Sequence, residues 1–289
     1  MSGPPRLRRA PVLVTGAAGK TGLAVTAALA RRGVPVRAGL HGPASEPAAH
    51  QAGARQCLTI DLVSAAGLPE AMRGVSAVYL IAPNMHPDEV GITVRVLEAA
   101  GSAGVARVAY HSVLHPHHRG MPHHLRKADA EQLVRGCGMA WTVLQPASYQ
   151  QNLLAAARSG RIVVPYGVDV PFTPVDLADV AEVAAAVLTE PGHERASYEL
   201  AGPDLLDVAT MAEQAGQVLG RPVIAEAMTP TAWARGPGSG LPASQRADLL
   251  AMFAAYDAGG LAGNPGVLAW LLGRPPGSWR ALLNRSLTP

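Results

Sequence analysis

The chain has 289 residues, of which 48% are hydrophobic and 16% are charged, and its formal net charge is +3. This composition provides enough apolar side chains for a sizeable core and too little charge for a disordered chain. The basic residues are scattered, so they give no sign of a nucleic-acid-binding surface. We expect one main domain with a smaller appended region.

The cysteines and the apolar segments bear on the expected cellular location of the protein. Cys57 and Cys137 are far apart and form no CxxC pair, which gives no support to a disulfide framework or a cysteine-based metal site. The N-terminal stretch MSGPPRLRRAPVLVTG lacks the apolar core of a signal peptide, and no apolar run of about 18 residues occurs. We therefore expect a cytoplasmic protein with no membrane partner.

The first half of the chain alternates short apolar strands with amphipathic helices. Strands are expected at residues 11–16, 34–39, 56–62, 76–83, 105–113 and 140–146, and helices at 21–32, 64–73, 88–102 and 124–136. A strand, a helix and a strand within about 30 residues make the βαβ unit of a parallel sheet. The alternation predicts an α/β fold with a doubly wound, Rossmann-like parallel sheet.

After residue 152 this rhythm changes. Strands are expected at residues 161–165 and 196–200, helices at 175–189 and 207–219, and a Pro- and Gly-rich connection follows at 229–242. The tail contains the large side chains Trp233, Met252, Phe253, Tyr256, Trp270 and Trp279. They form either a lid over a substrate or the ordinary packing of small helices.

The motif TGAAGKTG carries the strongest chemical signal. Gly16, Gly19 and Gly22 follow a predicted strand and open a predicted helix. Glycines there allow a tight turn and let backbone N–H groups approach a pyrophosphate at the positive end of the helix. We expect a dinucleotide site that includes Ala18, Lys20 and Thr21 as well; the alternative is a turn of purely structural use.

The second and third strands indicate which dinucleotide binds. An NAD site usually places a carboxylate at the end of the second strand, whereas this chain has Arg37 and His41 there. Cations suit a ribose 2′-phosphate, so NADPH is favoured over NADH, although Arg37 could equally be a solvated strand end. Asp61 and Leu62, closing the third strand, are placed to meet the adenine; the alternative for Asp61 is a helix N-cap.

Taken together, the motifs resemble the NmrA-like branch of the atypical short-chain dehydrogenases/reductases. The likeness is carried, over nearly the whole chain, by VLVTGAAGKTG, TIDL, AVYLIAP, VAYHSV, Lys127 with Glu131, WTVLQPASYQQN, PVDLADVAEVAAAVL and YELAGP. That family includes quinone reductases, redox-sensing regulators and polyketide-tailoring enzymes. The resemblance implies that Ile81, Ala82, Pro83, Pro146, Ala147 and Ser148 flank the nicotinamide and its ribose.

The resemblance also indicates a catalytic set. Short-chain dehydrogenases use a serine on the fifth strand and a tyrosine four residues before a lysine, which binds the ribose. Ser112 and Lys127 match two of these positions, but His123 stands in place of the tyrosine. Either His123 donates the proton near neutral pH, or the substrate carries its own acidic hydroxyl.

Six of the ten histidines lie within residues 111–124, HSVLHPHHRGMPHH. A metal site would need several ligands at set spacings, and two prolines and a glycine interrupt this segment. We expect no metal. The stretch follows the fifth strand at the carboxyl edge of the sheet, where ligands of open α/β folds bind, and most of its histidines belong to a polar loop over that site, with His117 and His118 solvated.

From the resemblance we expect an NADPH-dependent reductase of a planar aromatic carbonyl compound, such as a polycyclic hydroxyquinone of an aromatic polyketide pathway. The many arginines beside only two lysines, typical of a GC-rich coding sequence, favour that setting. The alternatives are a non-catalytic NAD(P) sensor and a monooxygenase-type tailoring protein. Substrate contacts are expected from Gln145, Tyr149, Gln150 and Asn152.

The expected organisation is a dinucleotide-binding domain at residues 1–155 and a substrate-binding or lid region at 156–289, with residues 174–200 returning to the main domain. The expected partner is a small aromatic molecule, and the protein is a monomer or a homodimer.

Overall fold

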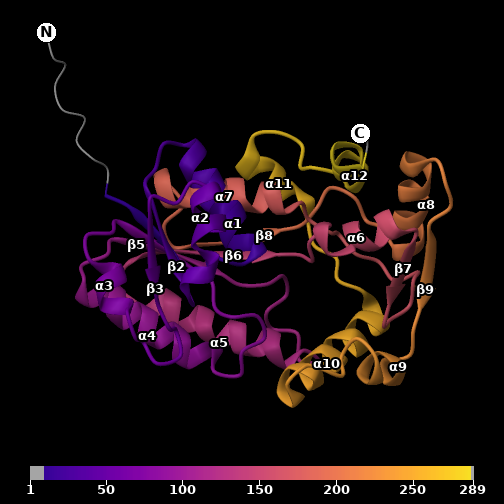
Figure 1. Ribbon diagram of the computed structural model, residues 1–289, viewed down its shortest axis with the longest axis horizontal. Helices are drawn as coiled ribbons and strands as arrows, with labels where there is room; N and C mark the ends of the chain where they lie inside the picture. Colours follow the sequence, from indigo (N-terminus) through magenta and orange to yellow (C-terminus); the bar gives the residue numbers. More distant parts are fainter. Residues whose placement is uncertain (1–9, 288–289) are drawn as a thin grey trace, which may run out of the picture.

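The computed structural model describes residues 10–287, and its centre is a seven-stranded parallel sheet. The strand order is β3-β2-β1-β4-β5-β6-β8 (Figure 1). The strands are β1 (Val12–Val14), β2 (Val36–Leu40), β3 (Gln56–Thr59), β4 (Ala77–Leu80), β5 (Arg107–His111), β6 (Ala140–Pro146) and β8 (Ala196–Leu200). This confirms the predicted Rossmann-like fold, in which the order reverses between β1 and β4.

Helices cover both faces of the sheet (Figure 1). One layer holds α1 (Lys20–Arg31) and α7 (Leu177–Thr189), which pack against each other. The opposite layer holds α3 (Leu68–Met72), α4 (Glu89–Ser102) and α5 (Pro122–Gly136). The sequence prediction missed a short 3-10 turn, Pro43–Ser45, and the helix α2 (Glu46–Gln51) that follows it, because neither has a long apolar period.

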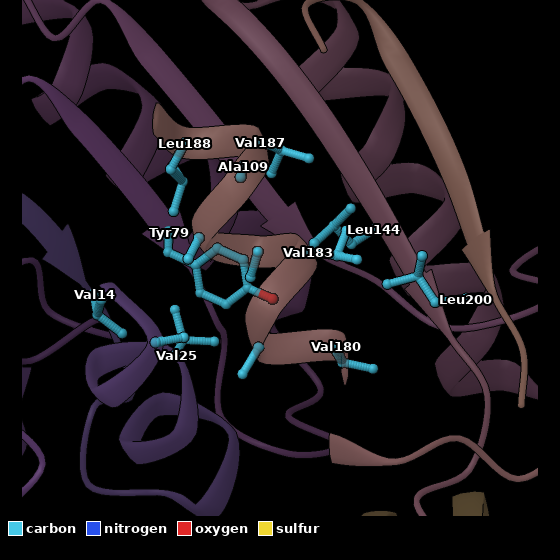
Figure 2. Packing of buried hydrophobic residues seen from close by; sticks show 14 of the residues in the cluster. Val14, Val25, Tyr79, Ala109, Leu144, Val180, Val183, Val187, Leu188 and Leu200 are labelled. Carbon is cyan, nitrogen blue, oxygen red and sulfur yellow. The ribbon is translucent and has the colours of Figure 1, made fainter. Parts of the chain in front are cut away.

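Alternation along the strands builds two cores, one on each face. Val12 and Val14 point into the core under α1 and α7, while Leu13 between them points into the core under α3, α4 and α5. The first core gathers under α7, where Val183 and its neighbours pack over Tyr79 (Figure 2). Because the strands between these two apolar layers are all parallel, their carboxyl ends lie at one edge of the sheet.

A second lobe is built around the parallel pair β7 (Arg161–Val164) and β9 (Ile224–Ala227). Its other elements are α6 (Gln151–Ser159), α8 (Val208–Leu219), α9 (Pro230–Arg235), α10 (Ala243–Gly259) and α12 (Trp279–Leu287). Helix α11 (Pro265–Leu272), which lies between α10 and α12 in the chain, packs instead on α7 and β8 of the main sheet. Trp279 is fully buried in the core of this lobe and its Nε1 donates to Met211 O at 2.9 Å. Trp270, by contrast, is 69% exposed.

The chain returns to the main sheet between the two strands of the second lobe. After β7, helix α7 covers the sheet and β8 pairs with β6, in the register Thr142↔Ala196 to Pro146↔Leu200. The division into a dinucleotide-binding domain and a lid region stays a prediction. Within residues 10–287, the structure has no helix that is both long and apolar enough to span a membrane.

The return of β8 to the sheet can be tested by cavity formation. Leu200 is fully buried, so Leu200→Ala should lower the free energy of unfolding by about 2–5 kcal/mol in chemical denaturation. The matched control is Leu205→Ala, because Leu205 is 64% exposed and should change stability by no more than about 0.5 kcal/mol. Equal effects of the two substitutions would contradict the placement of β8.

Candidate active site

A cleft of about 1060 Å³ opens at the carboxyl ends of the parallel strands and extends to the second lobe. It contains almost all the residues that the sequence assigned to a dinucleotide. Those that line it are Gly16, Ala18, Gly19, Lys20, Thr21, Gly22, His41, Asp61, Leu62, Ile81, Ala82, Pro83, Lys127, Pro146, Ala147 and Ser148. One cleft therefore joins segments from five strand ends with Lys127 of α5, as expected of an open α/β fold.

The glycine loop has the geometry of a phosphate cradle. Gly16 has φ +58°, and a Cβ on Gly22 would lie 2.4 Å from the Gly16 carbonyl oxygen, so α1 begins directly against the turn. Gly19 is the N-cap of α1 and has no side chain to cap the first-turn N–H groups. Those donors, at the positive end of the helix, fit a pyrophosphate.

Arg37 does not reach the cleft, contrary to the sequence prediction. Its guanidinium donates to the carbonyl oxygens of Ala71 at 2.8 Å and Arg73 at 2.7 Å, at the end of α3, and to Gln56 Oε1 at 2.9 Å. Side chains alternate along a strand, so Arg37 faces the α3 layer. His41, just past the end of β2, does line the cleft. Of the two basic side chains predicted at this strand end, it is therefore the one that can face a bound dinucleotide.

Asp61 lines the cleft, as predicted, and it is not the helix N-cap that the sequence offered as an alternative, because the N-cap of α3 is Gly67. Its carboxylate accepts from the Val63 amide at 2.8 Å and from the Ser64 hydroxyl at 2.6 Å, and these hydrogen bonds lower its pKa. The turn that they hold continues through Ala65, with φ +64°, and Gly67, with φ +77°. Helix α3 therefore begins at Leu68 rather than at Ser64 as predicted.

The opposite wall consists of the segments after β4 and β6. Ile81, Ala82 and Pro83 line the cleft, as do Pro146, Ala147 and Ser148. Their contact with a nicotinamide, which the resemblance implied, stays a prediction. Thr15 fastens the first of these walls to the glycine loop. Its hydroxyl donates to Ile81 O at 2.9 Å and accepts from Ile81 N at 2.8 Å.

Ser112 and Lys127 both line the cleft, but each is already engaged. The buried Ser112 hydroxyl donates to the fully buried carboxylate of Glu131. Lys127 Nζ donates to Glu89 Oε1 at 2.8 Å and to His111 O at 3.1 Å. The sequence analysis missed Glu89. Its carboxylate compensates the charge of Lys127, the residue that the resemblance implied would bind the ribose.

His123 lies in the first turn of α5, which begins at Pro122, and its ring lines the cleft. The residue is 7% exposed, and Nδ1 is buried without a hydrogen-bond partner among residues 10–287. Burial, with the nearby His124, Arg126 and Lys127 as secondary causes, lowers the pKa of His123 to about 3. At neutral pH the ring is therefore uncharged.

Four further histidines of this segment pack locally or face solvent. His124 is buried against His115, whose carbonyl oxygen is 3.1 Å from its Nδ1, and burial lowers the pKa of His124 to about 4. His118 Nδ1 accepts from the Gly120 amide, and His117 is exposed. Across the described part of the chain, no three His, Cys, Asp or Glu side chains gather as metal ligands.

The four residues predicted to contact substrate divide into two pairs. Tyr149 and Asn152 line the cleft. Gln145 instead donates to Glu131 Oε1 at 2.8 Å, and Gln150 donates to the carbonyl oxygens of Pro174 and Gly277, so both amides lie in the protein interior. The pleat accounts for Gln145, which lies within β6 and faces the α5 layer.

The second lobe contributes an aromatic wall that the sequence indicated only in part. Met252, Phe253 and Tyr256 on α10 line the cleft, as expected of a lid. Tyr166 and Phe172, which the prediction missed, join them: the Tyr166 ring centroid lies 5.4 Å from Phe172 and 5.5 Å from Tyr256. Of the three remaining candidates, Trp233 packs behind Phe253, and Trp270 and Trp279 lie outside the cleft lining.

The sequence analysis also missed the role of His111, the last residue of β5. Its ring lies at the cleft floor between two phenols, with Nδ1 2.7 Å from the Tyr79 hydroxyl and Nε2 3.0 Å from the Tyr149 hydroxyl. Burial, and secondarily the charge of Lys127, lowers the pKa of His111 to about 3. The feature of the sequence that could have indicated this role is the position of His111 at the end of a strand, next to Ser112.

Comparison with protein families matches residues 16–191 to a family described as NAD(P)H-binding. A (4-alkanoyl-5-oxo-2,5-dihydrofuran-3-yl)methyl phosphate reductase of Streptomyces griseus is 33% identical over 73% of this chain and 75% of its own length. An NAD(P)H azoreductase of Xenophilus azovorans is 32% identical over 75% of this chain and 77% of its own.

A quinone oxidoreductase 2 of Escherichia coli is similar over a greater length. It is 29% identical over 91% of this chain and 94% of its own. The crystal structure of the NADPH-dependent quinone oxidoreductase of E. coli in complex with NADPH superposes with a TM-score of 0.82, at 26% identity, over 96% of this chain and 100% of that one. The match therefore includes the second lobe as well as the sheet.

The glycine loop can be tested through Gly19. A Cβ there would meet only the Gly16 carbonyl oxygen, at 3.4 Å, so Gly19→Val should keep the fold. Its branched side chain would occupy the cradle, and NADPH binding in a fluorescence titration should be abolished. The control is Gly101→Ala, on the open side of α4, which should bind normally. Retained binding in Gly19→Val would remove the loop from the site.

The buried histidines make stability depend on pH. The unfolded chain binds protons on His123 and His124 below about pH 6.5, while the folded protein keeps both neutral down to about pH 3 and about pH 4. Stability is therefore full above pH 6.5 and falls as the pH drops towards 4, by up to about 1.4 kcal/mol per pH unit for each histidine.

Denaturant unfolding at several pH values measures this dependence. The double variant His123→Phe, His124→Phe should show a shallower loss of stability between pH 6.5 and 4 than the parent. His117→Gln, which changes an exposed histidine of the same loop, should leave the slope unaltered. Identical slopes in all three proteins would show that the two buried rings do not titrate as described.

Proposed function

Since this chain belongs to the NmrA-like, NAD(P)H-binding family of oxidoreductases, we propose that it reduces a carbonyl of a planar aromatic compound. The substrate class that we favour is a polycyclic hydroxyquinone. The observation that carries the proposal is the aromatic wall of Tyr166, Phe172, Phe253 and Tyr256, which lines the same cleft as the residues expected to bind the nicotinamide. Such a wall suits a flat, apolar ring system, which gains by stacking on aromatic side chains.

Named relatives support the reductase part of this proposal. The Xenophilus relative is an NAD(P)H azoreductase, and the E. coli relatives are quinone oxidoreductases. The Streptomyces relative reduces a furanone-bearing phosphate, so its substrate is chemically different. The polyketide substrate is our extension, motivated by the aromatic wall and by the composition of the chain.

Two steps complete a carbonyl reduction. When bound, NADPH would supply the hydride. The proton must come from elsewhere, and His123 is neutral at working pH while the Ser112 hydroxyl is committed to Glu131. A hydroxyl of the substrate beside the reduced carbonyl is the remaining acid, and the neutral His123 ring, on the cleft surface, would orient it by a hydrogen bond.

The rival functions differ in what they require. A dinucleotide sensor needs the glycine loop and His41 but no aromatic wall. A monooxygenase-type protein would consume dioxygen. The wall favours an enzyme over a sensor, because its four aromatic side chains otherwise have no use in nucleotide binding.

We expect NADPH to bind more tightly than NADH, and His41 to be the source of the preference. His41→Ala should reduce the ratio of the two affinities by about two- to tenfold, the effect of one hydrogen bond. Arg37→Met is the matched control: it should lower stability through the lost contacts with α3 and leave the ratio unchanged. Loss of the preference in Arg37→Met, but not in His41→Ala, would reverse the assignment.

The function itself is tested by quinone-dependent oxidation of NADPH, followed by absorbance, with hydroxyquinones, quinones lacking hydroxyls and aliphatic ketones. We expect turnover only with the aromatic substrates and fastest with a hydroxyl beside the carbonyl. His123→Phe should raise KM and lower kcat by less than about tenfold, because the ring orients rather than protonates. A loss of about 10²–10⁴-fold would make His123 the proton donor after all.

The comparison with His117→Gln controls for general effects on the loop. Absence of NADPH oxidation with every quinone, while NADPH still binds, would favour the sensor. Oxidation that consumes dioxygen in step with the substrate would favour the monooxygenase.

A further inference from the structure

His111 is the centre of a hydrogen-bonded chain that crosses the floor of the cleft. Its Nδ1 meets the hydroxyl of Tyr79, on the neighbouring strand β4, at 2.7 Å, and its Nε2 meets the hydroxyl of Tyr149 at 3.0 Å. The Tyr149 hydroxyl in turn accepts from Thr21 Oγ1 at 3.2 Å. Four residues from β4, β5, the segment after β6 and α1 are thus joined in one line.

The ring of His111 has no bonding capacity left for a ligand. A neutral imidazole carries one N–H donor and one acceptor nitrogen, and here each nitrogen already has a phenol as its partner. The low pKa agrees with a ring that stays neutral. Although His111 lies at the cleft floor, its side chain is therefore occupied on both sides by the protein itself.

Tyr149 transmits this arrangement to the start of α1. Besides the hydrogen bond with Thr21, its ring lies 5.5 Å below Lys20 Nζ, and Lys20 also donates to Asn152 Oδ1. Lys20 and Thr21 are the first two residues of the helix whose N–H groups form the phosphate cradle. A shift of Tyr149 would therefore move or loosen the end of the helix that binds the dinucleotide.

We propose that His111 is a positioning residue for the dinucleotide: its Nε2 holds Tyr149, and Tyr149 holds the first turn of α1 in place at the carboxyl edge of the sheet. The Nδ1 contact with Tyr79 anchors the ring to β4. The main chain of His111 takes part as well, because its carbonyl oxygen accepts from Lys127 Nζ at 3.1 Å. His111 thus fixes both Tyr149, through its ring, and Lys127, through its carbonyl oxygen.

This inference rests on the proposed binding of NADPH and does not depend on any substrate. Two conservative substitutions separate the contacts of the ring. The side-chain amide of asparagine ends near the position of Nδ1, and that of glutamine ends near the position of Nε2. His111→Asn therefore keeps the Tyr79 contact and loses Tyr149, whereas His111→Gln keeps Tyr149 and loses Tyr79.

We expect His111→Gln to bind NADPH within about twofold of the parent and His111→Asn to bind it about three- to tenfold more weakly, the loss from one hydrogen bond. Melting temperatures should fall by similar amounts in both, since each loses one contact. A purely structural role predicts that affinity follows stability and is the same in the two variants. Equal affinities, or the weaker affinity in His111→Gln, would overturn the proposal.

A second variant covers the case in which either substitution prevents folding. Tyr149→Phe removes only the hydroxyl and keeps the ring beneath Lys20, and it should weaken NADPH binding as much as His111→Asn does. Combining the two should cause no further loss, because both break the same link. Additive losses would overturn the proposal. Failure of every quinone assay alongside this binding pattern would count against the proposed reductase and not against the role of His111.

Discussion

The approach of α1 to the end of β1 is the constraint on which the rest of the site depends. Gly22 packs so closely on the Gly16 carbonyl that there is no room for a Cβ between them. This closeness places the positive end of the helix over the strand edge. The walls after β4 and β6 then converge on the same point because the strands are parallel and their carboxyl ends share one edge.

Most charges near the cleft are compensated by partners within the protein. Lys127 is paired with Glu89, and Arg126 on α5 is paired with the largely buried Asp248 on α10. Lys20 keeps a neutral amide partner, and burial lowers its pKa. The part of the cleft lined by α5 and α10 therefore presents apolar surface and uncharged imidazoles, and a strongly charged substrate would find few groups there to neutralise it.

The sequence was sufficient for the sheet, the glycine loop and the strand ends, because each depends on periodicity or on glycine at a fixed spacing. It could not decide which way Arg37 and Gln145 point, since both lie in strands where neighbouring residues face opposite layers. It also could not reveal the partners of His111, Lys127 and Ser112. Those partners come from segments far away in the chain, such as Tyr79, Glu89 and Glu131, and only packing brings them together.

The burial of Trp279 in the second lobe has a consequence for the order in which the protein forms. The seven-stranded sheet is complete once Leu200 has been synthesised. The lobe that carries the aromatic wall lacks the indole at its centre until the last helix has left the ribosome. During translation the sheet can therefore form before the second lobe, whose core is completed only when α12 packs into it.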